Sequence, residues 1–502
     1  MASILYDCTR LLSRHNAPTA TGIDRVDIRY LNHLMETLPK GEVLGVYQSE
    51  GGLFALTSQQ QKMLRDLVFA RWIDLKPSDC ADEKQLTHLY KETLGTKKKI
   101  SASPSNSALE GRIDPELINK VNAGEGTATY LNCSHHGLLE QDIFINLRNV
   151  LGCRILFYIH DLIPIDFSEY VREGDSETHT RRMHHAAVFA DVILVNSEFT
   201  RKRFLTFCKD ESLEAPPCEV LVIGVEPTFI SLAKKQSASE MAVEQPYFIT
   251  IGTIEPRKNH LLLLNVWRDL IEKTGSAPKL VIVGKRGWSN QNTFDFLDRC
   301  EVARSYIHEY SDLPDTELIA LLKGAQALLF PSFSEGWGMP LVEAIAAGTP
   351  VISSDIEVFH EASQERALFI DPVDGARWRE AILEFAQPDS KKRRLVVDSM
   401  AGFVLPTWEQ HFQLFDAVLK GEHTVRPRRA VCGMGSRLEL PAYKVEREQA
   451  SEGLWIDRMI YRLIPARNHR KYEKFKRSPV RFLADSRKPS LRTLGEFLSR
   501  GA

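Results

Sequence analysis

The clearest chemical signal in this sequence is a glycine-rich segment with two glutamates. Residues 334–344 read SEGWGMPLVEA, so seven residues separate Glu335 from Glu343. Pro340 suits a first helical turn, which predicts a helix that starts near Met339. The free N–H groups of a helix start can bind a phosphate, and carboxylates beside it can accept hydrogen bonds from sugar hydroxyls. The simpler alternative is a capped helix with a solvated glutamate.

A second segment places two cations side by side. Residues 252–260 read GTIEPRKNH and precede a predicted helix over 260–273. Arg257 can neutralise a diphosphate with its planar fork, and Lys258 can do so as a point charge. A cation at a helix N-terminus is unfavourable for the helix dipole, which favours a bound anion there. A solvated basic helix start is the alternative. No Asp-x-Asp sequence here forms an obvious metal site.

Short apolar runs followed by small or polar residues must position these segments. Such runs, alternating with amphipathic stretches, are typical of a parallel sheet covered by helices. A polar stretch over 231–245 reads as a linker, so we expect two Rossmann-like domains that face a cleft. Ligands of open α/β sheets bind beyond the carboxyl ends of the strands. The candidate strands are 155–159, 192–195, 221–223, 247–251, 280–283, 327–330 and 351–353.

Together these segments resemble the family 4 retaining glycosyltransferases, which have the GT-B fold. The resemblance covers about residues 1–420 and is strongest over 246–373. The Glu-x7-Glu motif of that family matches Glu335 and Glu343, and its diphosphate-binding lysine falls on Lys258. Many members carry an arginine where this chain has Thr253, and Arg257 can supply that charge. The sequence TIEPRKN resembles a branch with bacterial mannosyl- and rhamnosyltransferases of surface polysaccharide synthesis.

The resemblance also implies roles for individual residues. It implies that Glu335 holds donor-sugar hydroxyls and Glu343 the ribose, while His160 binds the donor sugar or steadies the transition state. A lone histidine after a strand is otherwise more often structural, and His135 and His136 are weaker candidates for acceptor contacts. The implied catalytic residues are His160, Glu335, Lys258 and Arg257. The implied donor-binding residues are Gly22, Gly252, Thr253, Arg257, Lys258, Gly284, Glu335, Gly336, Trp337, Gly338, Met339, Pro340, Leu341 and Glu343.

The chain divides into three predicted parts. We expect an acceptor-side domain over 1–240, completed by a crossover helix over 407–420, and a nucleotide-sugar domain over 246–406. The tail 425–502 carries 19 Lys and Arg against 8 Asp and Glu, a net charge of +11. Its segment 467–498 interleaves cations with aromatic and apolar residues, which is typical of binding to an anionic membrane surface. Packing on the first domain and docking to a partner protein remain alternatives.

Composition narrows the class of protein. The 502 residues are 43% apolar and 26% charged with a net charge of −2, which is typical of globular domains and unlike a basic nucleic-acid binder. None of the 8 cysteines forms a Cys-x-x-Cys pair, so neither a zinc cluster nor a disulfide framework is expected. The start of the chain lacks signal-peptide features. We expect a cytoplasmic protein that can associate peripherally with the inner face of the plasma membrane.

These observations lead to one main hypothesis and two alternatives. The main hypothesis is a retaining hexosyltransferase that moves a hexose, for example mannose from GDP-mannose, to a lipid-linked or growing surface polysaccharide such as lipopolysaccharide or capsule. GDP- and UDP-linked donors both remain open, and no metal or other cofactor is expected. The alternatives are a GT-B-fold sugar-nucleotide epimerase and a catalytically silent subunit of a transferase complex.

Overall fold

The first half of the chain forms a mostly parallel sheet. The structure is a computed structural model and describes residues 3–49, 52–74, 80–94, 113–124, 126–234 and 243–421. Within them, the first sheet has the strand order β3-β2-β1-β4-β5-β6-β7, and only β2 and β3 pair antiparallel. Its strands are β1 (Ile4–Asp7), β2 (Val43–Ser49), β3 (Gly52–Ala55), β4 (Thr129–Asn132), β5 (Arg154–Ile159), β6 (Val192–Val195) and β7 (Cys218–Val220).

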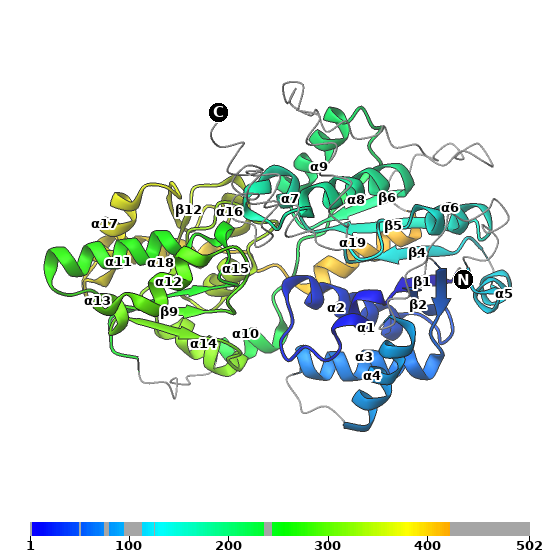
Figure 1. The fold of residues 1–502 in the computed structure, drawn as a ribbon, viewed down its shortest axis with the longest axis horizontal. Helices are drawn as coiled ribbons and strands as arrows, with labels where there is room; N and C mark the ends of the chain where they lie inside the picture. The colour runs from blue at the N-terminus through cyan, green and yellow to red at the C-terminus, as the bar shows by residue number, and fades with distance from the viewer. Residues whose placement is uncertain are drawn as a thin grey trace, which may run out of the picture. The chain divides into compact units, whose positions relative to one another are not determined.

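The second sheet is parallel throughout and has the order β10-β9-β8-β11-β12-β13 (Figure 1). The chain crosses between neighbouring positions through helices, so both sheets are Rossmann-like and each presents the carboxyl ends of its strands at one edge. The strands are β8 (Tyr247–Ile251), β9 (Lys279–Val283), β10 (Ile307–Tyr310), β11 (Leu328–Phe330), β12 (Val351–Ser354) and β13 (Leu368–Ile370).

Helices cover both sheets. In the first half they are α1 (Thr9–Arg14), α2 (Gly22–Thr37), α3 (Ser58–Trp72), α4 (Cys80–Thr93), α5 (Pro115–Asn122), α6 (Gln141–Asn149), α7 (Ile163–Asp166), α8 (Asp175–Phe189), α9 (Glu198–Asp210) and α10 (Pro227–Lys234). In the second half they are α11 (His260–Thr274), α12 (Gln291–Arg299), α13 (Glu301–Arg304), α14 (Asp315–Gly324), α15 (Met339–Ala346), α16 (Glu357–Ser363), α17 (Gly375–Ala386), α18 (Lys391–Ser399) and α19 (Trp408–Lys420).

Most predicted strands are present within one residue of their expected bounds, but one prediction is wrong. The sequence predicts a strand over 221–223, whereas β7 is Cys218–Val220. The run is buried beneath α19, and only its first residue continues the ladder, with the Leu221 N–H donating to the carbonyl oxygen of Val195 in β6 at 2.8 Å. The carbonyl oxygen of Leu221 accepts from the Tyr158 hydroxyl at 2.9 Å, and that of Val222 contacts His411 Nδ1 at 2.9 Å.

The last described helix, α19, packs on the first sheet and on α2. It begins at a capping box in which Thr407 accepts from the backbone of Gln410. Its apolar face carries Phe415, whose ring lies edge-on to Tyr30 of α2 at 4.7 Å. At its carboxyl end, Arg154 of β5 donates to the carbonyl oxygen of Val418 at 3.0 Å. One apolar core therefore joins α2, the first sheet and α19 (Figure 1).

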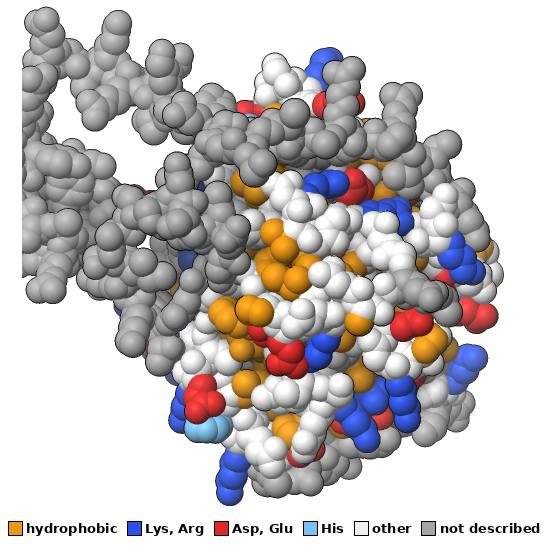
Figure 2. Space-filling model, turned by 90° about the vertical axis from the view of Figure 1, so that its right-hand side faces the viewer, with side chains coloured by type: hydrophobic (Ala, Val, Ile, Leu, Met, Phe, Trp, Pro, Cys, Tyr) orange, Lys and Arg blue, Asp and Glu red, His pale blue; other side chains and the backbone are white. Residues whose placement is uncertain are grey.

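The surface seen in Figure 2 mixes both signs of charge. Lys and Arg side chains alternate there with Asp and Glu, and apolar side chains form small patches between them. Among the described residues, no helix is long and apolar enough to cross a bilayer. The predicted tail, 425–502, and its segment 467–498 lie outside the described residues.

Candidate active site

The start of α15 forms the centre of the candidate site. Gly338 is the residue before the helix and has φ +99°, a left-handed conformation that a residue with a Cβ adopts only under strain. The helix then begins at Met339 with Pro340 in its first turn, as predicted. The preceding loop carries Glu335, which is 8% exposed and lies beyond the carboxyl end of β11.

Glu335 lies between the two predicted cations. Its Oε2 pairs with Arg257 Nη1 at 2.7 Å, and its Oε1 pairs with Lys258 Nζ and accepts from the Ser332 hydroxyl at 2.9 Å. Arg257 also pairs with Glu255 at 2.7 Å and donates to the carbonyl oxygen of Ser334 at 2.7 Å. The structure therefore brings the two sequence motifs together in a single ion-pair cluster.

Electrostatics keep Glu335 ionised. Burial alone would raise the pKa of this carboxyl group, but Arg257 and then Lys258 lower it to about 2. Burial lowers the pKa of the Lys258 ammonium, while Glu335 opposes that shift. Two carboxylates, Glu335 and Glu255, face the two cations, so the cluster is close to neutral. An added diphosphate would therefore compete with Glu335 for Arg257 and Lys258. The Glu335 carboxylate would then be free to accept hydrogen bonds from other donors.

Gly336 lets the loop touch the first half of the chain. A Cβ at this position would lie 2.1 Å from the carbonyl oxygen of His160, so only glycine fits. The carbonyl oxygen of Gly336 accepts from Ser197 Oγ at 2.8 Å, and Ser197 also caps α9. The side-chain amide of Asn196 donates to the carbonyl oxygen of His160 at 2.8 Å. Residues after β5, β6 and β11 thus meet at one point.

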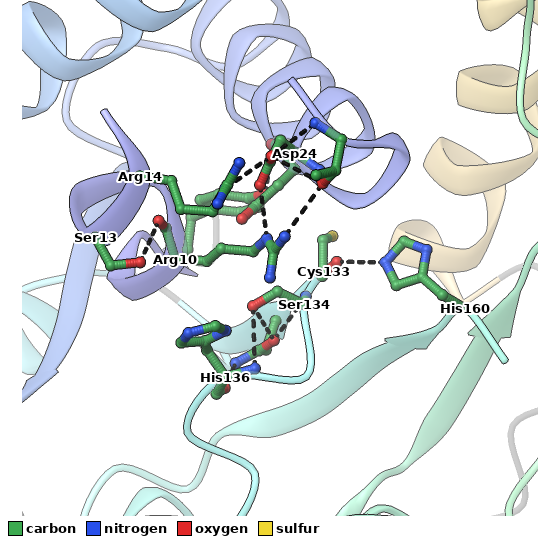
Figure 3. Close-up of polar contacts among 12 residues, drawn as sticks. Arg10, Ser13, Arg14, Asp24, Cys133, Ser134, His136 and His160 are labelled. Atoms are coloured by element: carbon green, nitrogen blue, oxygen red, sulfur yellow. Dashed lines mark hydrogen bonds and ion pairs between the residues drawn. The ribbon is translucent and has the colours of Figure 1, made fainter. Parts of the chain in front are cut away.

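His160 lies directly after β5 and is 4% exposed. Its Nε2 contacts the carbonyl oxygen of Cys133 at 2.8 Å, which fixes the proton on Nε2 and leaves Nδ1 as the acceptor nitrogen (Figure 3). Burial lowers the pKa of His160 to about 4 even though the Cys133 hydrogen bond opposes the shift. The ring is therefore neutral at pH 7, and it can accept a hydrogen bond but supplies no positive charge.

Glu343, the second glutamate of the motif, lies on α15 and faces an arginine that the sequence did not reveal. Arg25 of α2 reaches Glu343 Oε1 and Asp315 Oδ2, each at 3.6 Å. Burial raises the pKa of Glu343 to about 7 against the lowering effect of Arg25, with Asp315 and Glu226 adding to the rise. Arg25 lies three residues after Gly22, an implied donor-binding residue, and this proximity in sequence was the only available signal.

The remaining predicted donor residues occupy several places around this cluster. Gly252 and Gly284 end neighbouring strands, and a Cβ at Gly284 would lie 1.9 Å from the carbonyl oxygen of Gly252. Thr253 is exposed beside them. Gly22 is the first residue of α2, and a Cβ at this position would lie 3.2 Å from Met339 Sδ. The starts of α2 and α15 therefore face each other. Leu341 is fully buried. Trp337 lines a separate cavity of about 390 Å³ with residues of α16 and α19.

A polar network on the first sheet faces the same region (Figure 3). Asp24, fully buried, pairs with Arg10 and Arg14 of α1, each at 2.8 Å, and forms a capping box with Thr21. His136 follows β4 in the loop opposite Arg10. Sequence reasoning named His136 but not Arg10, and it gave Asp24 no role of its own, although Thr21 followed by Asp24 has the spacing of a capping box. Within the described ranges, no group of three or more His, Cys, Asp or Glu could hold a metal.

Comparisons with known proteins fit this architecture. Residues 233–397 match the family model described as glycosyl transferases group 1. O-antigen chain mannosyltransferase B of Escherichia coli is 27% identical over 270 residues, which are 51% of this chain and 67% of the relative. The serotype-specific mannosyltransferase WbdA of Escherichia coli is 26% identical over 80% of this chain and 45% of its own length. RfbU, an O-antigen chain mannosyltransferase of Salmonella typhimurium, is 36% identical over 30% of this chain and 41% of its own length.

A solved structure agrees in fold. The α,α-trehalose 6-phosphate synthase of Burkholderia multivorans superposes with a TM-score of 0.51 and 14% identity, over 86% of this chain and all of that one. Two Rossmann-like sheets with a helix that returns to the first define the GT-B class of glycosyltransferases. The chain has this fold, and the match to glycosyl transferases group 1 lies over residues 233–397, mostly in the second sheet and its helices. It spans about two thirds or less of the length of these three mannosyltransferases.

Proposed function

We propose that the protein is a retaining hexosyltransferase that moves mannose from GDP-mannose to a growing surface polysaccharide. One observation carries the proposal: ionised Glu335 lies between Arg257 and Lys258 beside the start of α15. This arrangement offers cations and helix N–H groups to a diphosphate and a carboxylate to the sugar next to it. The mannosyltransferase names of the relatives support the choice of sugar.

The proposed mechanism uses these groups as follows. The bond between the anomeric carbon and the diphosphate breaks through a transition state that resembles an oxocarbenium ion. Arg257, Lys258 and the N–H groups at the start of α15 stabilise the negative charge that grows on the diphosphate. The acceptor hydroxyl attacks on the face that the diphosphate leaves, and a departing phosphate oxygen takes its proton. Glu335 and neutral His160 hold donor-sugar hydroxyls, Glu343 holds the ribose, and no metal takes part.

A donor screen tests this proposal. Purified full-length chain is first mixed with UDP-, GDP- and ADP-sugars, and its thermal unfolding is followed. We expect GDP-mannose to raise the midpoint selectively, because a ligand that binds only the folded state stabilises it. Transfer to a short mannoside acceptor is then followed by NMR, with an α-linked product from the α-linked donor as the expected result. A β-linked product would contradict retention, and release of an epimerised sugar would favour the epimerase alternative.

A silent subunit would bind a partner without turning over any nucleotide sugar. The transferase names of the relatives lend no support to this alternative or to the epimerase. Turnover of the donor, by transfer or by slow hydrolysis, distinguishes the enzyme from the silent subunit. Complete absence of both with every nucleotide sugar would overturn the proposed activity.

The basic tail is part of the same proposal. We propose that residues 467–498 hold the enzyme at an anionic membrane surface where a lipid-linked acceptor lies. The support is the sequence, in which cations alternate with aromatic and apolar residues. Full-length chain and a 1–424 truncation are compared in co-sedimentation with vesicles of phosphatidylglycerol and phosphatidylcholine. Only the full-length chain should pellet, and less so at high salt. Equal pelleting of both would overturn the membrane role.

A further inference from the structure

Arg182 of α8 is a partly buried cation without an acidic partner. Among the described residues, no carboxylate lies within ion-pair distance of it, and its Nε is buried without a hydrogen-bond partner. Burial lowers the pKa of this guanidinium, and the charge of Asp175, two turns away on the same helix, only partly opposes that. Leaving the buried Nε unpaired costs free energy, and the partly exposed guanidinium is open to water or to a ligand.

The neighbours of Arg182 on α8 show where its side chain lies. His179, one turn before it, contacts the carbonyl oxygen of Asp161 at 3.0 Å through Nε2. His185, one turn after it, contacts the carbonyl oxygen of Leu138 at 2.6 Å through Nδ1. Residues three apart share a helix face, so Arg182 lies between the segment after β5 and the loop after β4. That loop holds His135, whose ring stacks edge-on to His179 at 4.8 Å.

Arg10 faces the same loop from the opposite side. Its Nε donates to Asp24 at 2.8 Å and its Nη2 to Thr21 Oγ1 at 3.2 Å, while Nη1 makes no hydrogen bond within the described part of the chain. Figure 3 shows this free end of the guanidinium directed toward Ser134 and His136. The charges of both Arg10 and Arg182 contribute to lowering the pKa of His136 after burial, to about 4, as expected if both arginines lie near it.

The charge around this loop is positive. Arg10 and Arg14 share one carboxylate, Asp24, and Arg182 has none within ion-pair distance, so these four groups leave an excess of two positive charges. Asp7, which accepts from the Asn132 side chain at 3.2 Å, reduces that excess to one when it is ionised. The neutral His136 ring adds a group that can donate to an oxyanion, and so does the Ser134 hydroxyl if it leaves its long hydrogen bond of 3.4 Å to Asn132 Oδ1. The loop lies beyond the carboxyl end of β4, next to His160, and so beside the point where the proposed transfer takes place.

We propose that Arg10, Arg182 and the Ser134–His136 loop form an acceptor subsite for a phosphate group. Two guanidinium groups that approach from different sides suit a tetrahedral dianion with several oxygens better than a neutral glycan. The phosphate belongs either to a phosphorylated sugar or to the diphosphate of a lipid-linked glycan. The inference rests on the proposed transferase function, because it assigns this surface to the acceptor.

A binding experiment tests the subsite without requiring turnover. Full-length chain is saturated with GDP, so that the donor cations are occupied, and titrated calorimetrically with mannose 6-phosphate, mannose or octyl mannosyl diphosphate. We expect one or both phosphorylated probes to bind at least about tenfold more tightly than mannose, the effect of a charged hydrogen bond. Preference for mannose 6-phosphate indicates a sugar phosphate, and preference for octyl mannosyl diphosphate indicates a lipid-linked source. Equal binding of mannose and both phosphorylated probes overturns the proposal.

Two neighbouring arginines provide a matched pair of variants. Arg182→Gln should remove the preference for phosphate, whereas Arg181→Gln, at an exposed position one residue earlier on α8, should keep it. Arg182→Lys keeps the charge but loses the fork and should give an intermediate preference. Arg182→Lys is also the variant to measure if Arg182→Gln does not fold. Retention of the full preference in folded Arg182→Gln, or its loss in Arg181→Gln, would refute the subsite. Failure of the wild-type chain to bind GDP would instead count against the proposed donor site.

Discussion

Glu335 pairs with both cations that can bind a diphosphate, Arg257 and Lys258. Substitution of Lys258 therefore tests the site directly. Lys258→Ala leaves Glu335 paired with Arg257, so we expect the fold to persist. Turnover should fall about 100-fold or more, because groups that stabilise developing negative charge have effects of that size. Steady-state kinetics and thermal unfolding measure the two effects. Lys273→Ala, at a 60% exposed position on α11, is the control and should change neither.

If Lys258→Ala transferred mannose at the wild-type rate, the diphosphate would have to bind elsewhere. If the variant lost turnover only because it unfolded, the midpoint of unfolding would fall with it. The two results are distinguishable because both quantities are measured on the same preparation.

The pKa of Glu343 predicts a pH effect on stability. Burial raises this pKa from 4.5 to about 7, so the folded chain holds the proton more tightly than the unfolded chain does. The folded state therefore loses stability as pH rises from about 4.5 to about 7, and the loss persists above that range. Glu343→Gln cannot ionise, so this loss of stability is absent from the variant. We therefore expect its free energy of unfolding, relative to that of wild type, to rise between pH 5 and pH 8, across the roughly two to three pH units that the linkage covers.

Urea unfolding at both pH values measures this difference, with Glu384→Gln, an exposed glutamate of α17, as the control. A relative stability of Glu343→Gln that stays constant with pH would show that Arg25 keeps the carboxylate ionised throughout.

At the scale of elements, the loop before α15 depends on a glycine that touches the other sheet. Gly336→Ala would place a Cβ 2.1 Å from the carbonyl oxygen of His160, so the loop must move away from β5. We expect turnover to fall about tenfold or more, because an ångström-scale displacement of reacting groups is costly. Gly375→Ala is the control, because a Cβ there would meet only Leu262 at 3.5 Å. Unchanged kinetics in Gly336→Ala would show that this contact does not position the site.

Much of the second sheet was predictable, whereas much of the first half was not. Strands such as β8 and β9 are mostly apolar runs, and Pro340 correctly marked the start of α15. The run 221–223 misled because burial under a distant helix produces the same apolar pattern as strand pairing. The ion pair of Arg25 with Glu343 joins residues more than 300 positions apart, and no local pattern encodes such a contact.

At the scale of the whole molecule, several contacts join the two sheets and their helices around the site. Glu361 of α16 accepts hydrogen bonds from the backbone N–H groups of Glu198 at 2.7 Å and Phe199 at 3.1 Å, at the start of α9. Tyr170, which follows α7, stacks on Phe333, which lies between β11 and α15, with ring centroids 5.0 Å apart. We expect water exclusion during the proposed transfer to depend on such contacts, because a reactive sugar exposed to water is hydrolysed.

Glu361 offers the clearest test of this closure. A carboxylate at the N-terminus of α9 satisfies two unpaired donors and complements the helix dipole, and Glu361→Ala removes both effects. We expect the variant to increase hydrolysis of GDP-mannose relative to transfer, because the two halves separate more readily, and to show a larger radius of gyration in solution scattering. Glu357→Ala on the same helix breaks only a pair between half-exposed side chains, with Lys202, and should behave as wild type, because exposed ion pairs contribute little. An unchanged ratio of hydrolysis to transfer in Glu361→Ala would mean that the remaining contacts between the halves, Arg25 with Glu343 among them, are sufficient to keep water out.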